Sequence, residues 1–379
     1  MKFIVSSSEL LSSLQSVSKV ISNKPLISIL ENILFDLDEA GKTLTLTASD
    51  QETILSVNMT IENIEEGGKT TMPAKLLIDT LKEFPDQPLG IIVDPNTNMA
   101  EISWETGKAS IPCSAADEYP QMRPLKDDHS TLTIEAEQLL EGITKTLFAV
   151  ADDELRPAMN GIFFDMKSDG LTFVASDAHK LVRFRQLNII PENENSFILP
   201  KKPANFLKGI LMKSEDTVTL KFDTHYAIFT SPRFNMACRL IEGNFPAYNS
   251  VIPAGNPKKV EIDRVECLTA LRRVAVFSNQ ASNLIKLKIA GNEINVSAQD
   301  LDFSISANER VRCRYENEDL EIGFKSTFLI EILSNISSPE VRIELADSAR
   351  AGLFIPVETE EEERRNDLLM LLMPIVIGD

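Results

Sequence analysis

The strongest constraint on the fold is a pattern that occurs three times along the chain. The segments "TLTASD" (45–50), "TFVASD" (172–177) and "NVSAQD" (295–300) each alternate apolar and polar residues and end in aspartate. These aspartates stand at positions 50, 177 and 300, so the spacings are 127 and 123 residues. Alternation with a period of two is typical of a half-buried strand. A repeat of this length indicates three structural units that are built alike.

A second set of segments follows the same two spacings. Pro73-Ala74-Lys75, Pro200-Lys201-Lys202 and Gly323-Phe324-Lys325 each precede a stretch in which apolar residues recur at helical spacing. A turn residue followed by this periodicity predicts the start of a helix. The agreement of two independent segments supports the triplication.

Each copy also opens with a predicted helix, and a strand pair follows it. The motifs Ser6-x-x-Glu9 and Asp263-x-x-Glu266 are capping boxes at the start of the first and third of these helices. The predicted apolar faces are Leu10, Leu14, Val17 and Ile21; Leu140, Ile143, Leu147 and Val150; and Leu268, Leu271, Val274 and Phe277. The strand pairs are "NILFDLDEAGKTLTL", "GIFFDMKSDGLTFVA" and "LIKLKIAGNEINVSA".

The predicted fold class is therefore α+β, with three repeated domains in each chain. Polar, proline-containing stretches at 122–130 and 252–259 separate the copies. We place an N-terminal domain at residues 1–127, a middle domain at 128–254 and a C-terminal domain at 255–379. The acidic stretch 358–367 is predicted to be a solvated loop, and the apolar run 368–377 to be a strand.

Composition and motifs exclude several classes of protein. The four cysteines lie far apart and form no C-x-x-C pair, which fits a reducing cytoplasm rather than a disulfide scaffold. No secretory leader or membrane span is predicted, because the apolar runs are too short. No phosphate-binding loop or nucleophile elbow occurs, and three scattered histidines make a histidine-rich metal site improbable. We expect no cofactor and no metal.

Two features leave alternatives open. The net charge of −19 opposes binding to nucleic acid, unless an acidic exterior surrounds a basic interior. Asp177 and His179 suggest a hydrolase, but the counterparts Asp50 and Asp300 have no histidine nearby. An aspartate that is present in every copy is typical of a turn that its own side chain stabilises. An enzyme and a repeat-built scaffold that never meets DNA remain alternatives.

Several short segments, in order and over nearly the whole length, carry a resemblance to a known family. These are "MKFIVSSSELLSSLQSVSKVI", "TTMPAKLL", "MNGIFF", "ASDAHKL", "NFPAYNSVIP", "EIGF" and the terminal "LMP". Together they resemble the bacterial sliding clamp, the β subunit of DNA polymerase III. The resemblance implies a non-catalytic cytoplasmic ring of two chains joined head to tail, with helices around the hole and antiparallel sheets outside. It also implies duplex DNA in the hole, bound without sequence preference, and an ATP-dependent clamp loader.

The resemblance further implies three sets of site residues. Lys24 and Lys75 match DNA-contacting arginines of the family, Lys201, Lys202 and Lys208 are middle-domain equivalents, and Arg272 and Arg273 are candidates in the third domain. The ring interface pairs a first-domain edge strand around Ala109 and Ile111 with Val276 and Phe277. An apolar groove for peptides of the polymerase and other partners comprises Met159, Ser176, Ala178, His179, Lys180, Leu181, Pro246, Val251, Phe328, Ala349, Ala351, Leu371, Met373, Pro374 and Ile375.

The chain departs from the family pattern at three places. Pro157 and Ala158 stand where family members often have aromatic residues beside the groove. Asp153 stands where glutamine is common, and an acid there is expected to repel phosphate. The C-terminal "IVIGD" is longer than the family's usual ending and lacks its basic residue.

Overall fold

A computed structural model describes residues 1–22, 24–25, 27–212, 214–357 and 365–377. The chain divides into two compact units. The first contains Met1–Leu140 and Asn205–Leu240, and the second contains Glu141–Ala204 and the chain from Ile241 onward. Helices α3 (Ala136–Leu147) and α4 (Lys201–Leu211) each begin in one unit and continue into the other. The domain boundaries that we place near residues 127 and 254 stay a prediction.

The first unit contains two antiparallel sheets, in the strand orders β5-β1-β7-β8-β9 and β10-β15-β16-β17-β4-β3-β2-β6. Its other helices are α1 (Ser7–Val17), α2 (Ala74–Leu81), and the 3-10 helices η1 (Ser18–Val20) and η2 (Ser28–Glu31). Its strands are β1 (Lys2–Ser6), β2 (Asn32–Asp38), β3 (Thr43–Ser49), β4 (Thr53–Thr60), β5 (Asn63–Glu66), β6 (Gly68–Pro73), β7 (Pro88–Asp94), β8 (Met99–Trp104), β9 (Gly107–Pro112), β10 (Ser130–Glu135), β15 (Thr217–Phe222), β16 (Tyr226–Thr230) and β17 (Phe234–Arg239).

The second unit is built on one long sheet, in the order β14-β11-β12-β13-β25-β24-β23-β18-β21-β20-β19-β22. Its other helices are α5 (Arg264–Ala275), α6 (Ser326–Asn335), η3 (Pro157–Met159) and η4 (Tyr248–Ser250). Its strands are β11 (Gly161–Lys167), β12 (Gly170–Ser176), β13 (Lys180–Gln186), β14 (Asn195–Pro200), β18 (Lys258–Asp263), β19 (Leu284–Ala290), β20 (Glu293–Asp300), β21 (Ile305–Arg314), β22 (Leu320–Lys325), β23 (Glu340–Leu345), β24 (Gly352–Pro356) and β25 (Asn366–Leu372).

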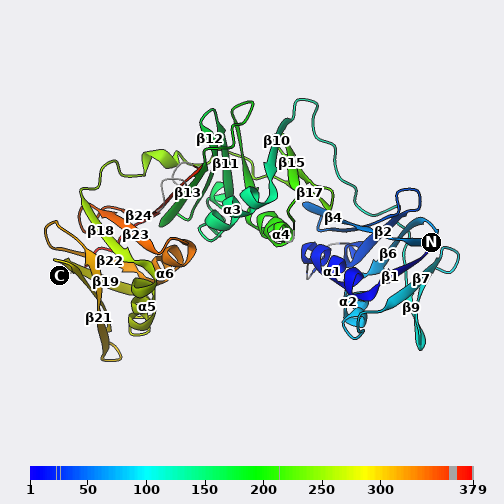
Figure 1. Ribbon diagram of the computed structural model, residues 1–379, viewed down its shortest axis with the longest axis horizontal. Coiled ribbons are helices and arrows are strands. Elements are labelled where there is room, and N and C mark those ends of the chain that lie inside the picture. The colour runs from blue at the N-terminus through cyan, green and yellow to red at the C-terminus, as the bar shows by residue number, and fades with distance from the viewer. Residues whose placement is uncertain (23, 26, 213, 358–364, 378–379) are drawn as a thin grey trace. The chain divides into compact units, whose positions relative to one another are not determined.

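The opening helices begin where the capping boxes predict. The Ser6 Oγ accepts a hydrogen bond from the Glu9 backbone N–H at 3.3 Å, and Asp263 accepts one from Glu266 at 2.8 Å. Within its unit, α1 packs against α2, and α5 packs against α6 (Figure 1). The apolar face predicted from Leu140, Ile143, Leu147 and Val150 is confirmed except at Leu140, which is half-buried while its neighbour Leu139 is fully buried.

The three strand pairs are confirmed as antiparallel hairpins, namely β2 with β3, β11 with β12 and β19 with β20. The C-terminal prediction is only partly right. Strand β25 ends at Leu372 instead of running to residue 377, because Pro374 has no backbone N–H to continue the ladder. The chain then returns to the sheet as an isolated bridge between Ile375 and Gly323. Of the acidic loop predicted at 358–367, residues 358–364 lie outside the described residues, and the prediction is wrong at Asn366 and Asp367, which belong to β25.

Strands from different sequence repeats join at two places. In the first unit β17 pairs with β4, and in the second unit β13 pairs with β25. We call these the first and second junctions. The turns before β4 and β13 contain two of the repeated aspartates, Asp50 and Asp177. Two of the three repeated aspartates therefore lie at the junctions between sequence repeats.

Candidate functional site

The turn that contains Asp177 is held by that residue's own side chain. One carboxylate oxygen of Asp177 accepts hydrogen bonds from the backbone N–H groups of His179, at 2.9 Å, and Lys180, at 2.8 Å. Asp50 accepts from the residues two and three positions further on in the same way, and so does Asp300. The turn role of the repeated aspartate is therefore confirmed. These bonds of Asp177 do not orient the His179 imidazole, so the geometry offers no hydrolase pair.

His179 and Lys180 extend from this turn to helix α6. The imidazole of His179 stacks near the ring of Phe328, with 5.9 Å between centroids, and Lys180 Nζ lies 4.2 Å from the same ring centroid. Lys180 Nζ also lies 2.9 Å from Asp177 Oδ2 and 2.9 Å from Glu331 Oε2. The contact between Lys180 and Glu331 is an ion pair only, because Glu331 Oε2 accepts no hydrogen bond. The Lys180 side chain is only 6% exposed, so it supports the site from inside rather than forming a polar edge.

An apolar cluster lies behind the turn at the second junction. Leu181 of β13 is paired with Leu371 of β25, which is also paired with Leu353 of β24. These side chains are buried together with Val174, Tyr248, Ala351 and Leu369. The Tyr248 hydroxyl donates to Asp165 at 2.7 Å, and burial raises the pKa of Tyr248, as does the bond to the carboxylate. The predicted groove residues Leu181, Ala351 and Leu371 therefore form its apolar base.

Other residues of the predicted groove surround this cluster to different degrees. Ser176 is buried and donates to the Lys180 carbonyl at 2.9 Å, while Ala178 has a positive φ of 72° at the tip of the turn. The Met373 backbone N–H donates to the His179 carbonyl at 2.8 Å. Met159 is buried in η3. Exposed positions are Pro246, Val251, Ala349 and Met373, whereas Pro374 and Ile375 are half-buried beyond β25.

The sequence did not single out several residues that belong to this arrangement. Phe163, Phe245, Ile252 and Ile355 pack against the cluster, and Phe245 stacks on Phe163 with ring centroids 4.9 Å apart. Glu331 was missed as the partner of Lys180. One signal was available, since Glu331 follows Phe328 by three positions in α6 and therefore shares its helix face.

Asp153 does not present an isolated charge. Its carboxylate lies 2.7 Å from Arg156, and the bond to that guanidinium holds the Asp153 pKa below its ordinary value. The expected repulsion of phosphate is therefore reduced by a neighbouring cation. Pro157 begins η3 and Ala158 lies within it, and neither has an aromatic ring for stacking.

The predicted DNA-contacting lysines lie in the first turns of α2 and α4, in the last turn of α4 and in the segment after η1. Lys24 is exposed after η1, and Lys75 is exposed in the first turn of α2. Lys201 and Lys202 are exposed in the first turn of α4, and Lys208 is half-buried in its last turn. Basic residues near a helix N-terminus oppose the helix dipole. Their presence there is consistent with an anionic ligand.

Strands β9 and β21 each have an edge that is unpaired, along all or most of its length, within the described residues. Strand β9 ends its sheet, and Ala109 and Ile111 lie in it. In β21, only Cys313 and Arg314 pair with β18, so the part from Ile305 to Arg312 has its outer edge unpaired within the described residues. Val276 and Phe277 are exposed after α5, and the sequence missed Leu301, Phe303 and Ile305, which are exposed around the start of β21.

Among the described residues, no cluster of histidine, cysteine and acidic side chains has the arrangement of a metal site. The four cysteines are buried free thiols, and burial raises the pKa of Cys238 to about 12. No helix in the described part of the chain is both long enough and apolar enough to cross a membrane.

Comparison with known proteins covers nearly the whole chain. Models of the DNA polymerase III beta subunit match as N-terminal domain at residues 1–123, central domain at 133–247 and C-terminal domain at 249–371. The beta sliding clamp of Synechococcus elongatus is 28% identical over 365 residues, covering 94% of this chain and 96% of the relative. That of Pseudomonas putida is 28% identical and covers 99% and 100%.

Solved structures agree. A sliding clamp from Pseudomonas aeruginosa, bound to griselimycin, superposes with a TM-score of 0.92 at 26% identity, with 100% of both chains covered. A DNA polymerase III beta subunit from Thermotoga maritima gives 0.88 at 25% identity, again over 100% of both chains. The chain therefore belongs to the family of beta sliding clamps, the non-catalytic DNA polymerase III beta subunits that make the polymerase processive.

Proposed function

We propose that two copies of this chain join head to tail into a ring around duplex DNA. The observation that carries this proposal is the repetition of the junction. Strand β4 is covered by β17, and its counterpart β13 is covered by β25. In the third repeat, the strand equivalent to β4 and β13 is β21, and it has an unpaired edge. In the first repeat, the strand equivalent to β17 and β25 is β9, and it also has an unpaired edge. A second copy can supply the missing pairing between β9 and β21, and such a heterologous contact forms a ring when its rotation closes.

The same proposal assigns roles to the predicted sites. Lys24, Lys75, Lys201, Lys202 and Lys208 contact phosphates, which carry no sequence information and so allow sliding. Ala109, Ile111, Val276 and Phe277 contribute to the interface between copies. The residues of the predicted groove at the second junction receive a short peptide of the polymerase, of the clamp loader or of another replication protein. An apolar base beside His179 suits leucine or phenylalanine anchors. A clamp loader opens the ring in the cytoplasm.

The test separates ring closure from partner docking. The protein is loaded on primed DNA circles with clamp loader and ATP, and retention is measured before and after the circle is cut. We expect retention on circles and loss from cut molecules, because a ring slides off a free end. Retention that does not depend on topology would contradict a ring.

Partner docking is read in the same system as the length of DNA synthesised per binding event. His179→Ala combined with Met373→Ala removes two exposed side chains of the docking site but leaves the buried base. We expect shorter products and slower loading, because the clamp loader is proposed to bind the same groove, whereas a variant ring that has been loaded should stay on the circle as long as the unaltered one. Unchanged product length would place docking elsewhere.

A further inference from the structure

The first and second junctions share their backbone construction in detail. Gln51, next to Asp50, has a φ of 78°, and Ala178, next to Asp177, has a φ of 72°. The Arg239 backbone N–H donates to the Glu52 carbonyl at 2.9 Å, and that of Met373 donates to the His179 carbonyl at 2.8 Å. The two junctions can therefore be compared position by position.

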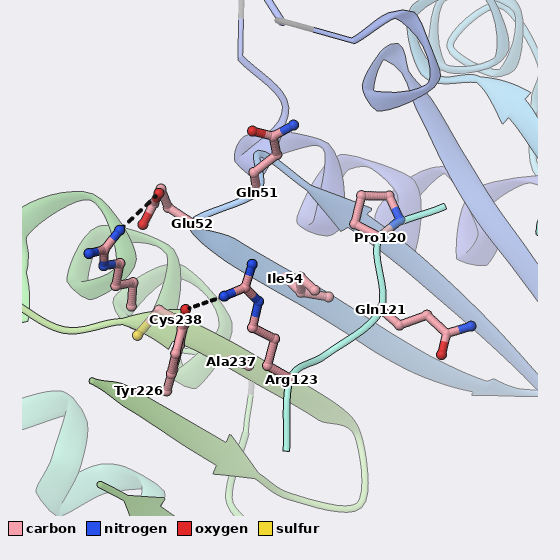
Figure 2. A pocket seen from close by; sticks show the side chains of 10 residues that line it. Gln51, Glu52, Ile54, Pro120, Gln121, Arg123, Tyr226, Ala237 and Cys238 are labelled. Atoms are coloured by element: carbon pink, nitrogen blue, oxygen red, sulfur yellow. Dashed lines mark hydrogen bonds and ion pairs between the residues drawn. The ribbon is translucent and has the colours of Figure 1, made fainter. Parts of the chain in front are cut away.

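A pocket of about 480 Å³ lies at the first junction, within the first unit (Figure 2). Strand pairing places several of its residues at positions equivalent to residues of the proposed peptide site. Gln51, Glu52, Ile54, Tyr226, Ala237 and Arg239 are the counterparts of Ala178, His179, Leu181, Ala351, Leu371 and Met373. The pocket is thus the first junction's version of the surface that we propose for docking at the second.

The chemistry of the two surfaces differs. Arg123 reaches from the segment that carries Pro120 and Gln121 toward Tyr226, whose hydroxyl accepts a hydrogen bond from its Nη1 at 3.1 Å (Figure 2). No carboxylate in the described part of the chain forms an ion pair with Arg123. Ile54 and Ala237 supply apolar surface. The second junction has no arginine at the equivalent of Arg239, where Met373 stands.

The acids Asp50 and Glu52 balance the two arginines of the pocket in formal charge, but neither acid is paired with Arg123. Glu52 lies 3.7 Å from Arg239, with side chains 63% and 50% exposed, and an exposed pair at this distance is weak and easily exchanged. The Asp50 carboxylate is engaged by the backbone N–H groups of Glu52 and Thr53. An incoming carboxylate can therefore bind Arg123.

We propose that this pocket is a second docking site, which takes a short extended peptide segment with a carboxylate side chain next to an apolar one. The carboxylate binds the Arg123 guanidinium, and the apolar side chain packs on Ile54 and Ala237. The apolar surface and the presence of Glu52 favour a peptide over a nucleic-acid phosphate. The inference rests on the proposed peptide site at the second junction as its template. Binding of a peptide in the pocket does not require that a peptide also binds at the second junction.

The probe is a capped nonapeptide of sequence GSGLDFGSG, compared with GSGLNFGSG, in which the carboxylate becomes an amide. Binding to the full chain is followed by the methyl NMR signals of Ile54 and Ala237, with the methyl signal of Ala351 as the reporter of the second junction. We expect the acidic peptide to shift the signals of Ile54 and Ala237 and the amide version to bind at least about fivefold more weakly. Arg123→Ala should weaken the acidic peptide about tenfold or more, because it removes a charge-assisted hydrogen bond.

The matched control is Arg233→Ala, which removes an exposed arginine of the same unit that is paired with Asp216. It should leave the affinity unchanged. The proposal is overturned if the two peptides bind equally, if neither shifts Ile54 and Ala237, or if only Ala351 responds. It is also overturned if a single-stranded oligothymidylate shifts these signals more strongly than the peptide. His179→Ala tests the template separately, since it should abolish responses at Ala351 and leave those at Ile54.

Discussion

At the scale of single residues, Lys180 is the position where the structure adds most to the sequence. Its side chain is 6% exposed and lies between Asp177 and Glu331, which come from the β12–β13 turn and from helix α6. A buried cation that loses its partners is costly, and so are partners that lose the cation. Lys180 therefore fixes the turn that carries His179 against the helix that carries Phe328.

We predict that Lys180→Met lowers the free energy of unfolding by about 2 kcal/mol, because it leaves the mostly buried carboxylate of Asp177 without its cation. Glu331 is 44% exposed and contributes less. Urea-induced unfolding, followed by circular dichroism, measures the change. In the double variant Lys180→Met with Glu331→Gln, part of the loss should be recovered.

Lys325→Met is the matched control, because Lys325 Nζ lies 4.6 Å from the same Phe328 ring centroid but is only half-buried. It should cost less than about 1 kcal/mol. If Lys180→Met proved no more costly than Lys325→Met, the supporting role of Lys180 would be wrong.

The aspartate turn could be predicted from sequence, whereas the Lys180 contacts could not. Three copies of the aspartate, only one with a histidine, were enough to separate a structural role from a catalytic one. Glu331, the partner of Lys180, lies in a helix of another repeat, and the one signal for it was its position three residues after Phe328, which the resemblance places in the same groove as Lys180. The family resemblance predicted an apolar groove, and the burial of Leu181 and Leu371 shows that these residues form its base.

At the scale of elements, the sequence predicted the helices and hairpins, and its errors have local causes. The shift from Leu140 to Leu139 in α3 is one step of a helical period, for which the second copy offered no capping box. The strand predicted at 368–377 was too long because its apolar content continued past Pro374. The joining of strands between repeats was not predictable from local patterns, because edges are chosen by long-range contacts.

The repeat also predicts the strand register between two copies. Met236 lies opposite Leu55, five residues after Asp50, and Met370 lies opposite Val182, five residues after Asp177. In each copy, the strand pairing can be followed from strand to strand back to the strand before the opening helix. Starting from Ala109, Met236 or Met370, it leads to the residue three positions before the cap of that helix, so these three residues are equivalent. Leu55 and Val182 each pair with the residue two positions before the repeated aspartate of their copy, and in the third copy the residue paired with that position is Ala307. We therefore expect Ala109 of one copy to lie opposite Ala307 of the other.

Ala109→Cys combined with Ala307→Cys should form a disulfide between chains under mild oxidation, because opposite residues of antiparallel strands have suitable Cα distances. Non-reducing electrophoresis measures the covalent dimer. The native cysteines are buried and should not interfere. The control is Ala109→Cys with Ser306→Cys, in which the second side chain points to the other face of the sheet. Equal cross-linking by both pairs would refute the register.

At the scale of the whole molecule, the net charge of −19 conceals an ordered distribution of charge. The opening helices α1, α3 and α5 have Glu9, Glu137 and Glu266 in their first turns, where the helix dipole favours an acid. The second helices have no acid there, and α2 and α4 instead begin with lysines. The sequence predicted three similar units. The proposal that they form a ring around DNA comes from the family resemblance, because closure depends on an angle that no local pattern encodes.

The lysines at these helix starts predict how DNA binding responds to salt. Lys24→Ala with Lys75→Ala should lower the affinity for a short duplex and reduce the slope of log K against log salt by about 0.9 for each phosphate that the protein no longer neutralises. Fluorescence anisotropy at several salt concentrations measures the slope. Lys2→Ala with Lys69→Ala changes the net charge equally on strands β1 and β6 and should leave the slope unchanged. Equal slopes for both double variants would mean that total charge governs binding, and Lys24 and Lys75 would then have no place in the DNA site.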